Sequence, residues 1–124
     1  TKNKKKTIKI LEIKGRKIRL ENFYDGVIKF NFDELFNKNL GSEDYIAIAD
    51  ISDFIFIINL PKFNQNNSNQ QQRFITFIDI IYEKRIPLMI TSEENLDFLG
   101  SSNNLSEPFK RTISRLHELT SKNY

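Results

Sequence analysis

Two arginines near the end of the sequence have the types and spacing of an anion-binding pair. Arg111 and Arg115 are four residues apart in a segment with helical apolar spacing, and Glu118 and Lys122 continue the same stripe. Like charges at this spacing repel by roughly 0.2–0.5 kcal/mol. An anion that accepts hydrogen bonds from both guanidinium groups would offset the repulsion. We therefore expect such an anion beside the pair: a phosphate, a carboxylate of a partner, or an acidic neighbour such as Glu107.

A third arginine, Arg73, stands at the start of another amphipathic segment. A cation is unfavourable at the positive end of a helix, so Arg73 is expected to have a compensating partner. Asp79 lies on the outer face of the same predicted helix, turned away from Arg73, and cannot be that partner. The interpretation that we favour is an ion pair that fixes this helix to the sheet.

The other polar side chains give little indication of catalysis. The chain has no cysteine and one histidine, His117, which excludes disulfides, thiolate chemistry and histidine metal clusters. Ser114 can touch His117 across one helical turn, but without an acidic residue to orient the imidazole they are interpreted as a surface pair. Two carboxylate pairs are interpreted as solvated side chains: Glu93 with Glu94, and Asp50 with Asp53.

A phosphate cradle is missing from the sequence. Neither G-x-x-x-x-G-K-[ST] nor G-x-G-x-x-G occurs, and the chain has only four scattered glycines. These 124 residues are therefore expected to hold no nucleotide by themselves.

The net charge of +3 divides unevenly along the chain. Residues 1–19 carry +8, whereas residues 20–124 carry −5, so the net positive charge belongs to the N-terminal arm and the first strands, and no nucleic-acid partner is expected. Residues 1–6, TKNKKK, are interpreted as a linker remnant ahead of a single domain over 7–124, inside a longer protein that begins before Thr1. No run of about eighteen apolar residues predicts a membrane span, so membrane contact is expected to be peripheral at most.

Alternating residues in the first part of the chain predict antiparallel strands. Apolar and charged residues alternate over 7–10 and again over 18–20, on either side of a turn at 14–16. Asp25-Gly26 predicts a hairpin turn, because both of its central positions need positive φ. A strand over 27–32 follows, which completes a half-buried β-meander.

The pattern then changes to helices and buried strands. Asn31 and Glu34 match a capping box that opens a helix over 32–37, and Ser42 is expected to cap a helix over 43–51. Residues 54–58 are apolar without alternation, which predicts a strand covered on both faces. An amphipathic helix, with Ser68 and Gln71 at capping-box spacing, and a strand over 86–91 complete a parallel βαβ unit.

The predicted fold is therefore α/β, with an N-terminal antiparallel β-meander followed by two short helices and a parallel βαβ unit with a C-terminal helix. The last helix begins after Ser106 and Pro108. Its inward face is predicted to consist of Phe109, Ile113, Leu116 and Thr120.

Several motifs occur in a characteristic order. The most specific are R-F-I-x-x-I-D-x-x-Y-[DE] at 73–83 and R-T-x-S-R-L-x-E at 111–118, followed by Ser121 and Tyr124. Further blocks lie at 15–18, 30–35, 40–49 and 57–61. Over about residues 15–124 the order resembles the second half of the ZapE/AFG-one-like ATPase family, which is similar to AAA-type P-loop ATPases. The departures are Phe36 in place of a usual cysteine, Asn59 in place of a common acidic residue, and Leu119 in place of a usual methionine.

The resemblance implies a parent protein with Walker A and Walker B motifs in an earlier half, absent from this chain. ATP and Mg²⁺ would bind in that parent, and none is expected on the isolated fragment. The family couples ATP hydrolysis to action on a protein partner, at the bacterial division ring or in quality control of mitochondrial inner-membrane proteins. The implied partners are the upstream half, a protein client or division-ring protein, and a second copy. The implied location is the cytoplasm or the mitochondrial matrix, with a peripheral position at the inner membrane as an option.

The resemblance also implies a role for the arginines. AAA-type assemblies often present an arginine to the γ-phosphate of a bound nucleotide. Arg111 and Arg115 are the candidate arginine finger or sensor, and Arg73 is a weaker candidate for nucleotide contact. Two hypotheses stay open: the non-catalytic half of an ATPase, inactive alone, or a protein-interaction module whose arginines are purely structural.

Overall fold

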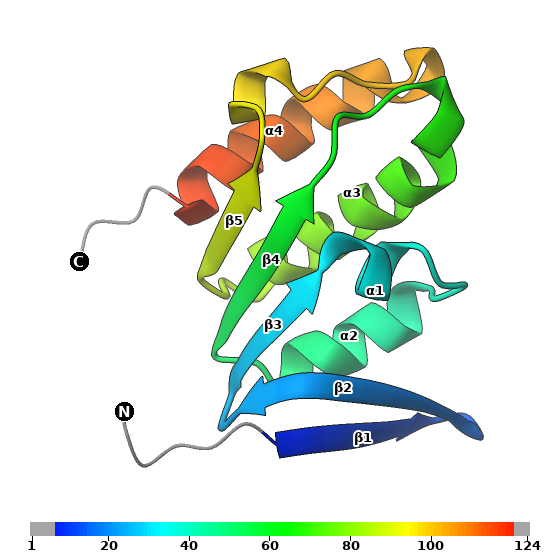
Figure 1. Ribbon diagram of the computed structural model, residues 1–124, viewed down its shortest axis with the longest axis vertical. Coiled ribbons are helices and arrows are strands. Elements are labelled where there is room, and N and C mark those ends of the chain that lie inside the picture. The colour runs from blue at the N-terminus through cyan, green and yellow to red at the C-terminus, as the bar shows by residue number, and fades with distance from the viewer. Residues whose placement is uncertain (1–6, 121–124) are drawn as a thin grey trace.

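Five strands form one mixed sheet with the order β1-β2-β3-β4-β5 in the computed structural model, which describes residues 7–120 (Figure 1). The strands are β1 (Thr7–Ile13), β2 (Arg16–Tyr24), β3 (Val27–Asn31), β4 (Phe54–Leu60) and β5 (Leu88–Ser92). The helices are α1 (Phe32–Phe36), α2 (Ser42–Asp50), α3 (Ser68–Glu83) and α4 (Ser106–Thr120), with short 3₁₀ turns η1 (Gln65–Asn67), η2 (Leu96–Phe98) and η3 (Asn103–Leu105). The predicted α/β class is confirmed, while the predicted linker at 1–6 lies outside the described residues.

The antiparallel half of the sheet consists of two hairpins, since β1 pairs with β2 and β2 pairs with β3. Lys14 and Gly15 turn the first hairpin with φ of 49° and 80°, and Asp25 and Gly26 turn the second with φ of 53° and 94°. Two successive positive φ values give a turn whose twist matches that of the paired strands. The predicted β-meander is confirmed.

The parallel half of the sheet is centred on β4. Ile55 pairs with Ile28 of β3 on one side and with Leu88 of β5 on the other. The connection from β3 to β4 contains α1 and α2, and the connection from β4 to β5 contains α3. The predicted βαβ unit is confirmed, with β5 beginning two residues later than expected.

The prediction that β4 is covered on both faces is wrong for the described residues. Ile55 and Ile57 are fully buried, whereas Phe54, Phe56 and Ile58 are partly exposed. In the view of Figure 1, α3 and α4 pass behind β4 and β5, and α1 and α2 lie to the right of β3, so none of the described helices covers the front of these strands. Because alternate residues of a strand point to opposite faces, the continuous apolar run serves two surfaces, and only one of them is covered.

The core between sheet and helices is built around α3. Phe74 and Phe77 of α3 meet Phe36 edge-on, with ring centroids 5.4 and 5.5 Å away, and Tyr45 of α2 meets Phe77 at 5.3 Å. Edge-to-face pairs contribute about 0.5–1.5 kcal/mol each beyond the area that they bury. These ring contacts hold α1 and α2 against the inner side of α3. They thereby fix the position of the outer side of α3.

The starts of α1 and α2 follow different rules. The capping box of α1 is confirmed, because the Asn31 side chain caps the first turn and the backbone N–H of Asn31 donates to the Glu34 carboxylate at 2.9 Å. The prediction that Ser42 caps α2 is wrong. Gly41 holds the cap position, and its N–H donates to the Asp44 carboxylate at 2.8 Å.

The capping box predicted from Ser68 and Gln71 is also wrong. Gln71 is fully buried; its side-chain amide donates to Ser101 Oγ at 2.8 Å and accepts from the Ser102 N–H at 3.0 Å. A buried amide must find its partners in the interior. Gln71 therefore ties α3 to the segment after β5 and takes no part in starting the helix.

The inward face of α4 is partly as predicted. It consists of Phe109, Thr112, Leu116 and Leu119. Ile113 and Thr120, which were expected on this face, are only partly buried. Within residues 7–120, every helix lacks the length and apolar character that crossing a membrane requires.

Candidate functional site

The two arginines of α4 share one carboxylate from α3. Arg115 Nη1 donates a hydrogen bond of 2.5 Å to Asp79 Oδ1, and Arg111 Nη2 lies 4.0 Å from Asp79 Oδ2. This carboxylate offsets the repulsion between the two guanidinium groups. The anion that the sequence required is therefore an acidic neighbour, although Glu107 is not that neighbour, because it pairs with Lys110 at 2.7 Å.

Tyr82 of α3 extends this contact. The Arg115 guanidinium lies over the Tyr82 ring, 4.6 Å from its centroid, and the Tyr82 hydroxyl donates to the Glu118 carboxylate at 3.0 and 3.1 Å. A cation over an aromatic ring contributes about 0.5–1 kcal/mol near the surface. We call this set of residues the α3–α4 cluster: Asp79, Tyr82, Arg111, Arg115 and Glu118.

Exposure separates the two arginines. The Arg115 side chain is 22% exposed and is held by both Asp79 and Tyr82, whereas the Arg111 side chain is 59% exposed. A long contact of 4.0 Å is too weak to engage the five donors of a guanidinium. Arg111 therefore keeps most of its donors for another acceptor, and Arg115 does not. Lys122, the last residue of the predicted stripe, lies outside the described residues.

Arg73 belongs to a different part of the structure. Its Nη1 donates to the backbone oxygen of Phe36 at 3.1 Å, at the C-terminal end of α1, where a cation is favourable. No carboxylate of residues 7–120 lies within ion-pairing distance, so the expected ion pair to the sheet is not formed. Arg73 instead ties α3 to α1, and it shares no contact with the α3–α4 cluster.

The buried phenol of Tyr45 lies close enough to Arg73 for the guanidinium charge to affect its pKa. Tyr45 is fully buried, and its hydroxyl has no hydrogen-bond partner among the described residues. Burial raises the pKa of Tyr45 from 10.0 to about 12, against a smaller lowering by the Arg73 charge. The phenol therefore stays protonated near neutral pH and is a packing group.

His117 has an acidic neighbour that the sequence did not reveal. Its Nε2 lies 3.0 Å from Asp97 Oδ1, on the turn η2 and twenty residues earlier in the chain. The two side chains are 49% and 62% exposed, which favours a solvated pair. The interpretation of His117 as a surface residue is retained, with Asp97 in place of Ser114 as its contact.

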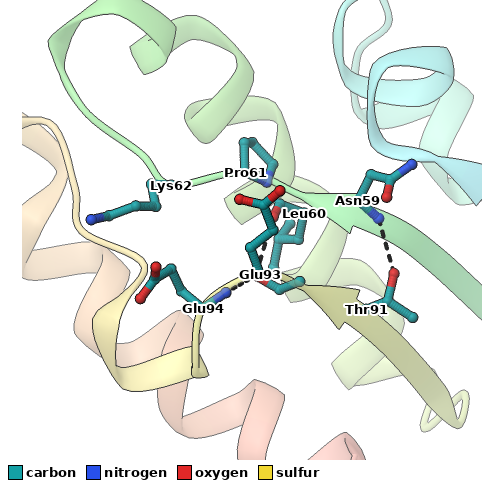
Figure 2. A pocket seen from close by; sticks show the side chains of 8 residues that line it. Asn59, Leu60, Pro61, Lys62, Thr91, Glu93 and Glu94 are labelled. Carbon is teal, nitrogen blue, oxygen red and sulfur yellow. Dashed lines mark hydrogen bonds between the residues drawn. The ribbon is translucent and has the colours of Figure 1, made fainter.

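A cavity of about 650 Å³ lies where β4 and β5 end (Figure 2). Asn59 has a positive φ of 62° there, and its N–H donates to Thr91 Oγ1 at 3.0 Å. Open α/β sheets commonly bind ligands at the carboxyl ends of their strands. The lining residues are Asn59, Leu60, Pro61, Lys62, Thr91, Ser92, Glu93 and Glu94.

The charge of this cavity is unsuited to a nucleotide. Figure 2 shows the carboxylates of Glu93 and Glu94 and the amine of Lys62 around it, and the Glu94 N–H is already bonded to Ser92 Oγ at 3.2 Å. Two carboxylates and one amine repel a polyphosphate. In the part of the chain that the structure describes, no group of three or more acidic or histidine side chains is placed to hold a metal ion.

The family to which the chain belongs follows from comparison with known proteins. The family model of the AFG1-like ATPases matches residues 1–124, so the chain is a member of that family of ATPases. It is 28% identical over 111 residues to lactation elevated protein 1 homolog B of Danio rerio, a match that covers 90% of this chain and 22% of that protein. It is 25% identical over 114 residues to the cell division protein ZapE of Escherichia coli K12, covering 92% of this chain and 30% of that protein. The chain thus spans less than a third of the length of these relatives. No solved structure matches.

The two most specific sequence blocks meet in the α3–α4 cluster. The block at 73–83 supplies Asp79 and Tyr82, and the block at 111–118 supplies the two arginines and Glu118. The sequence identified the arginines, but Asp79 was considered only as a partner for Arg73 and was placed on the outer face, turned away from it. The contact between Asp79 and the arginines depends on how α4 packs beside α3. The helical periodicity of the two segments does not predict that packing.

Proposed function

We propose that this chain is the C-terminal domain of an AFG1-like ATPase that couples ATP hydrolysis to action on a protein partner. The observation that carries the proposal is the α3–α4 cluster, where both family-specific blocks converge and Arg111 stays exposed. Because the chain has no glycine-rich phosphate loop and its cavity is acidic, ATP and Mg²⁺ would be held by an upstream half. The domain alone is expected neither to hydrolyse ATP nor to bind it tightly.

Arg111 is the residue that reaches the nucleotide in this proposal. A guanidinium with free donors can bond two phosphate oxygens and stabilise the charge that develops during phosphoryl transfer. Arg115 is a positioning residue, because it occupies Asp79 and thereby leaves Arg111 loosely held. Arg73 is the weaker candidate, since the Phe36 carbonyl already accepts from its guanidinium.

The proposed partner is a protein, because residues 20–124 carry a net charge of −5 and would repel nucleic acid. One relative is named a cell division protein, which favours a division-ring protein or another protein client as the partner. The corresponding location is the cytoplasm or the mitochondrial matrix, with peripheral contact at the inner membrane. Self-association would bring Arg111 of one copy to the nucleotide of the next.

Alanine substitutions in a polypeptide that carries the nucleotide-binding half test the proposal. We expect Arg111→Ala to lower kcat by about 100-fold or more with little change in ATP affinity. Arg115→Ala should lower both kcat and the melting temperature, because it releases Asp79 and Tyr82. Lys110→Ala is the matched control, since Lys110 is exposed, adjacent to Arg111 and paired across one turn with Glu107. Unchanged turnover in both arginine variants would contradict the proposal.

A second candidate is a protein-interaction module whose arginines are structural. The observation that favours it is that Asp79 contacts both arginines, so neither needs a phosphate to explain its charge. In that case Arg111→Ala lowers the melting temperature and leaves turnover unchanged. The isolated domain would also bind its protein partner in the absence of nucleotide.

A further inference from the structure

The central part of the sheet face that the helices leave open carries mostly apolar side chains. Strand pairing places Tyr24 beside Val27, Val27 beside Phe54, and Phe56 beside Met89 on this face. Met89 is 50% exposed, and the other side chains are partly exposed. We call this set of residues the outer sheet face: Tyr24, Val27, Phe54, Phe56, Ile58 and Met89.

The described chain does not bury this face itself. The rings of Phe54 and Phe56 lie 5.0 Å apart, and neither is part of the hydrophobic core or packed against it. Parallel strands in α/β proteins have both faces covered, and their sequences are correspondingly apolar on both faces. Exposed apolar area costs roughly 25 cal/mol per Å². The composition of β4 thus fits a second layer that residues 7–120 do not provide.

We propose that a helical layer of the nucleotide-binding half of the same polypeptide covers the outer sheet face. This inference rests on the proposed function. The matched region makes up only 22% and 30% of two relatives, so proteins of this family have ample further chain to form the layer. The helices of this chain lie on the other side of the sheet, and the proposed layer leaves Arg111 accessible.

The charge beside the apolar residues adds a requirement on the covering layer. Lys29 pairs with Phe56 in the same register and is exposed on the same face. It lines a small pocket together with Glu21 and Glu34, so carboxylates of this chain lie near it. A cation buried at an interface needs such partners. The covering layer is therefore expected to leave Lys29 next to these carboxylates, and the concentration dependence tested below distinguishes it from a second copy.

The absence of cysteine from the chain allows a direct test by thiol labelling. Met89→Cys places one thiol on the outer sheet face, and Ile46→Cys places a control thiol on α2, at a side chain that is 41% exposed. Both should react readily with a maleimide in the 124-residue chain. In a polypeptide that includes the nucleotide-binding half, with that half free of cysteine, labelling at position 89 should slow by about tenfold or more while labelling at position 46 persists. Thr91→Cys, exposed on the same strand, repeats the measurement without removing an apolar side chain.

Equal labelling of positions 89 and 46 in the longer polypeptide would overturn the proposed interface. Protection of position 89 that develops in the 124-residue chain as its concentration rises would identify a second copy as the occupant and would likewise overturn it. The ATPase assay separates this failure from failure of the proposed function. If Arg111→Ala abolishes turnover while position 89 stays reactive, the interface is wrong and the function stands.

Discussion

At the residue scale, Asp79 determines how the two arginines of α4 are used. It accepts a hydrogen bond of 2.5 Å from Arg115 and contacts Arg111 only at 4.0 Å. One carboxylate thus holds one guanidinium in place and leaves the other with free donors. The same carboxylate explains why Arg115 is mainly structural and why Arg111 is the better candidate for contact with a phosphate.

Replacing Asp79 tests this division. Asp79→Asn keeps the size of the side chain and removes its charge, so the two arginines repel without compensation. We expect the free energy of unfolding to fall by about 1–2 kcal/mol, measured by urea denaturation. Asp50→Asn is the matched control, because Asp50 forms a surface pair with Lys84 and its loss should cost less than about 0.5 kcal/mol. Equal losses in the two variants would show that Asp79 is only a surface charge.

Tyr45 gives a second residue-scale prediction, which concerns alkaline pH. Its hydroxyl is buried without a described partner, so Tyr45→Phe should raise the free energy of unfolding by about 1 kcal/mol at neutral pH. The pKa rises from 10.0 to about 12 on folding, so the wild-type protein should lose stability as the pH rises between these values.

The difference between wild type and Tyr45→Phe over this pH range isolates the effect. Tyr24→Phe, at a partly exposed tyrosine, serves as the control for general alkaline unfolding. A destabilised Tyr45→Phe variant, with the same alkaline slope as wild type, would show that the hydroxyl has a partner.

Single residues show how far the site could be predicted from sequence. Arg111 and Arg115 could be found because their spacing produces a repulsion that needs an anion. Asp79 could not be identified as that anion, because its distance from them depends on how α3 and α4 pack. Asp97 was missed for the same reason, since a turn brings it to His117 from twenty residues away.

At the element scale, some helix starts and some turns could be predicted from adjacent residues. Other helix starts are determined by tertiary contacts. The Asp25-Gly26 turn and the Asn31 cap depend on a few adjacent residues, and both were predicted correctly. Gln71 resembled a capping residue, yet its amide is used in the interior. The sequence of β4 shows which of its faces are apolar, but it does not show which segments of the protein cover each face.

The connection after β5 gives a prediction at this scale. Gly100 has φ of 77° and forms a β-bridge with Phe63. A Cβ added at Gly100 would lie 2.7 Å from the backbone oxygen of Phe63. Gly100→Ala should therefore cost about 1–3 kcal/mol, measured as a shift in the urea midpoint. Gly41→Ala is the control, because nothing lies within 4 Å of its added Cβ. A Gly100→Ala variant as stable as Gly41→Ala would mean that the bridge adjusts freely.

At the scale of the whole molecule, the sheet separates two surfaces with different proposed roles. The helical side carries the α3–α4 cluster, and the outer sheet face carries the uncovered apolar residues. The excess of positive charge lies in the first nineteen positions and the remaining residues are net acidic, which supports the proposal of a protein partner. Both surfaces support the proposal that this chain is one part of a larger ATPase.

We propose that Arg111 stabilises the transition state for hydrolysis of a nucleotide bound on another part of the protein. The most direct measurement compares ADP affinity with and without fluoroaluminate, a mimic of the transferring phosphoryl group, in a polypeptide that carries the nucleotide-binding half. We predict that fluoroaluminate strongly tightens ADP binding in the wild-type protein and in Lys110→Ala. In Arg111→Ala this gain should be lost while binding of ADP alone is unchanged. An equal gain in Arg111→Ala would contradict the claim.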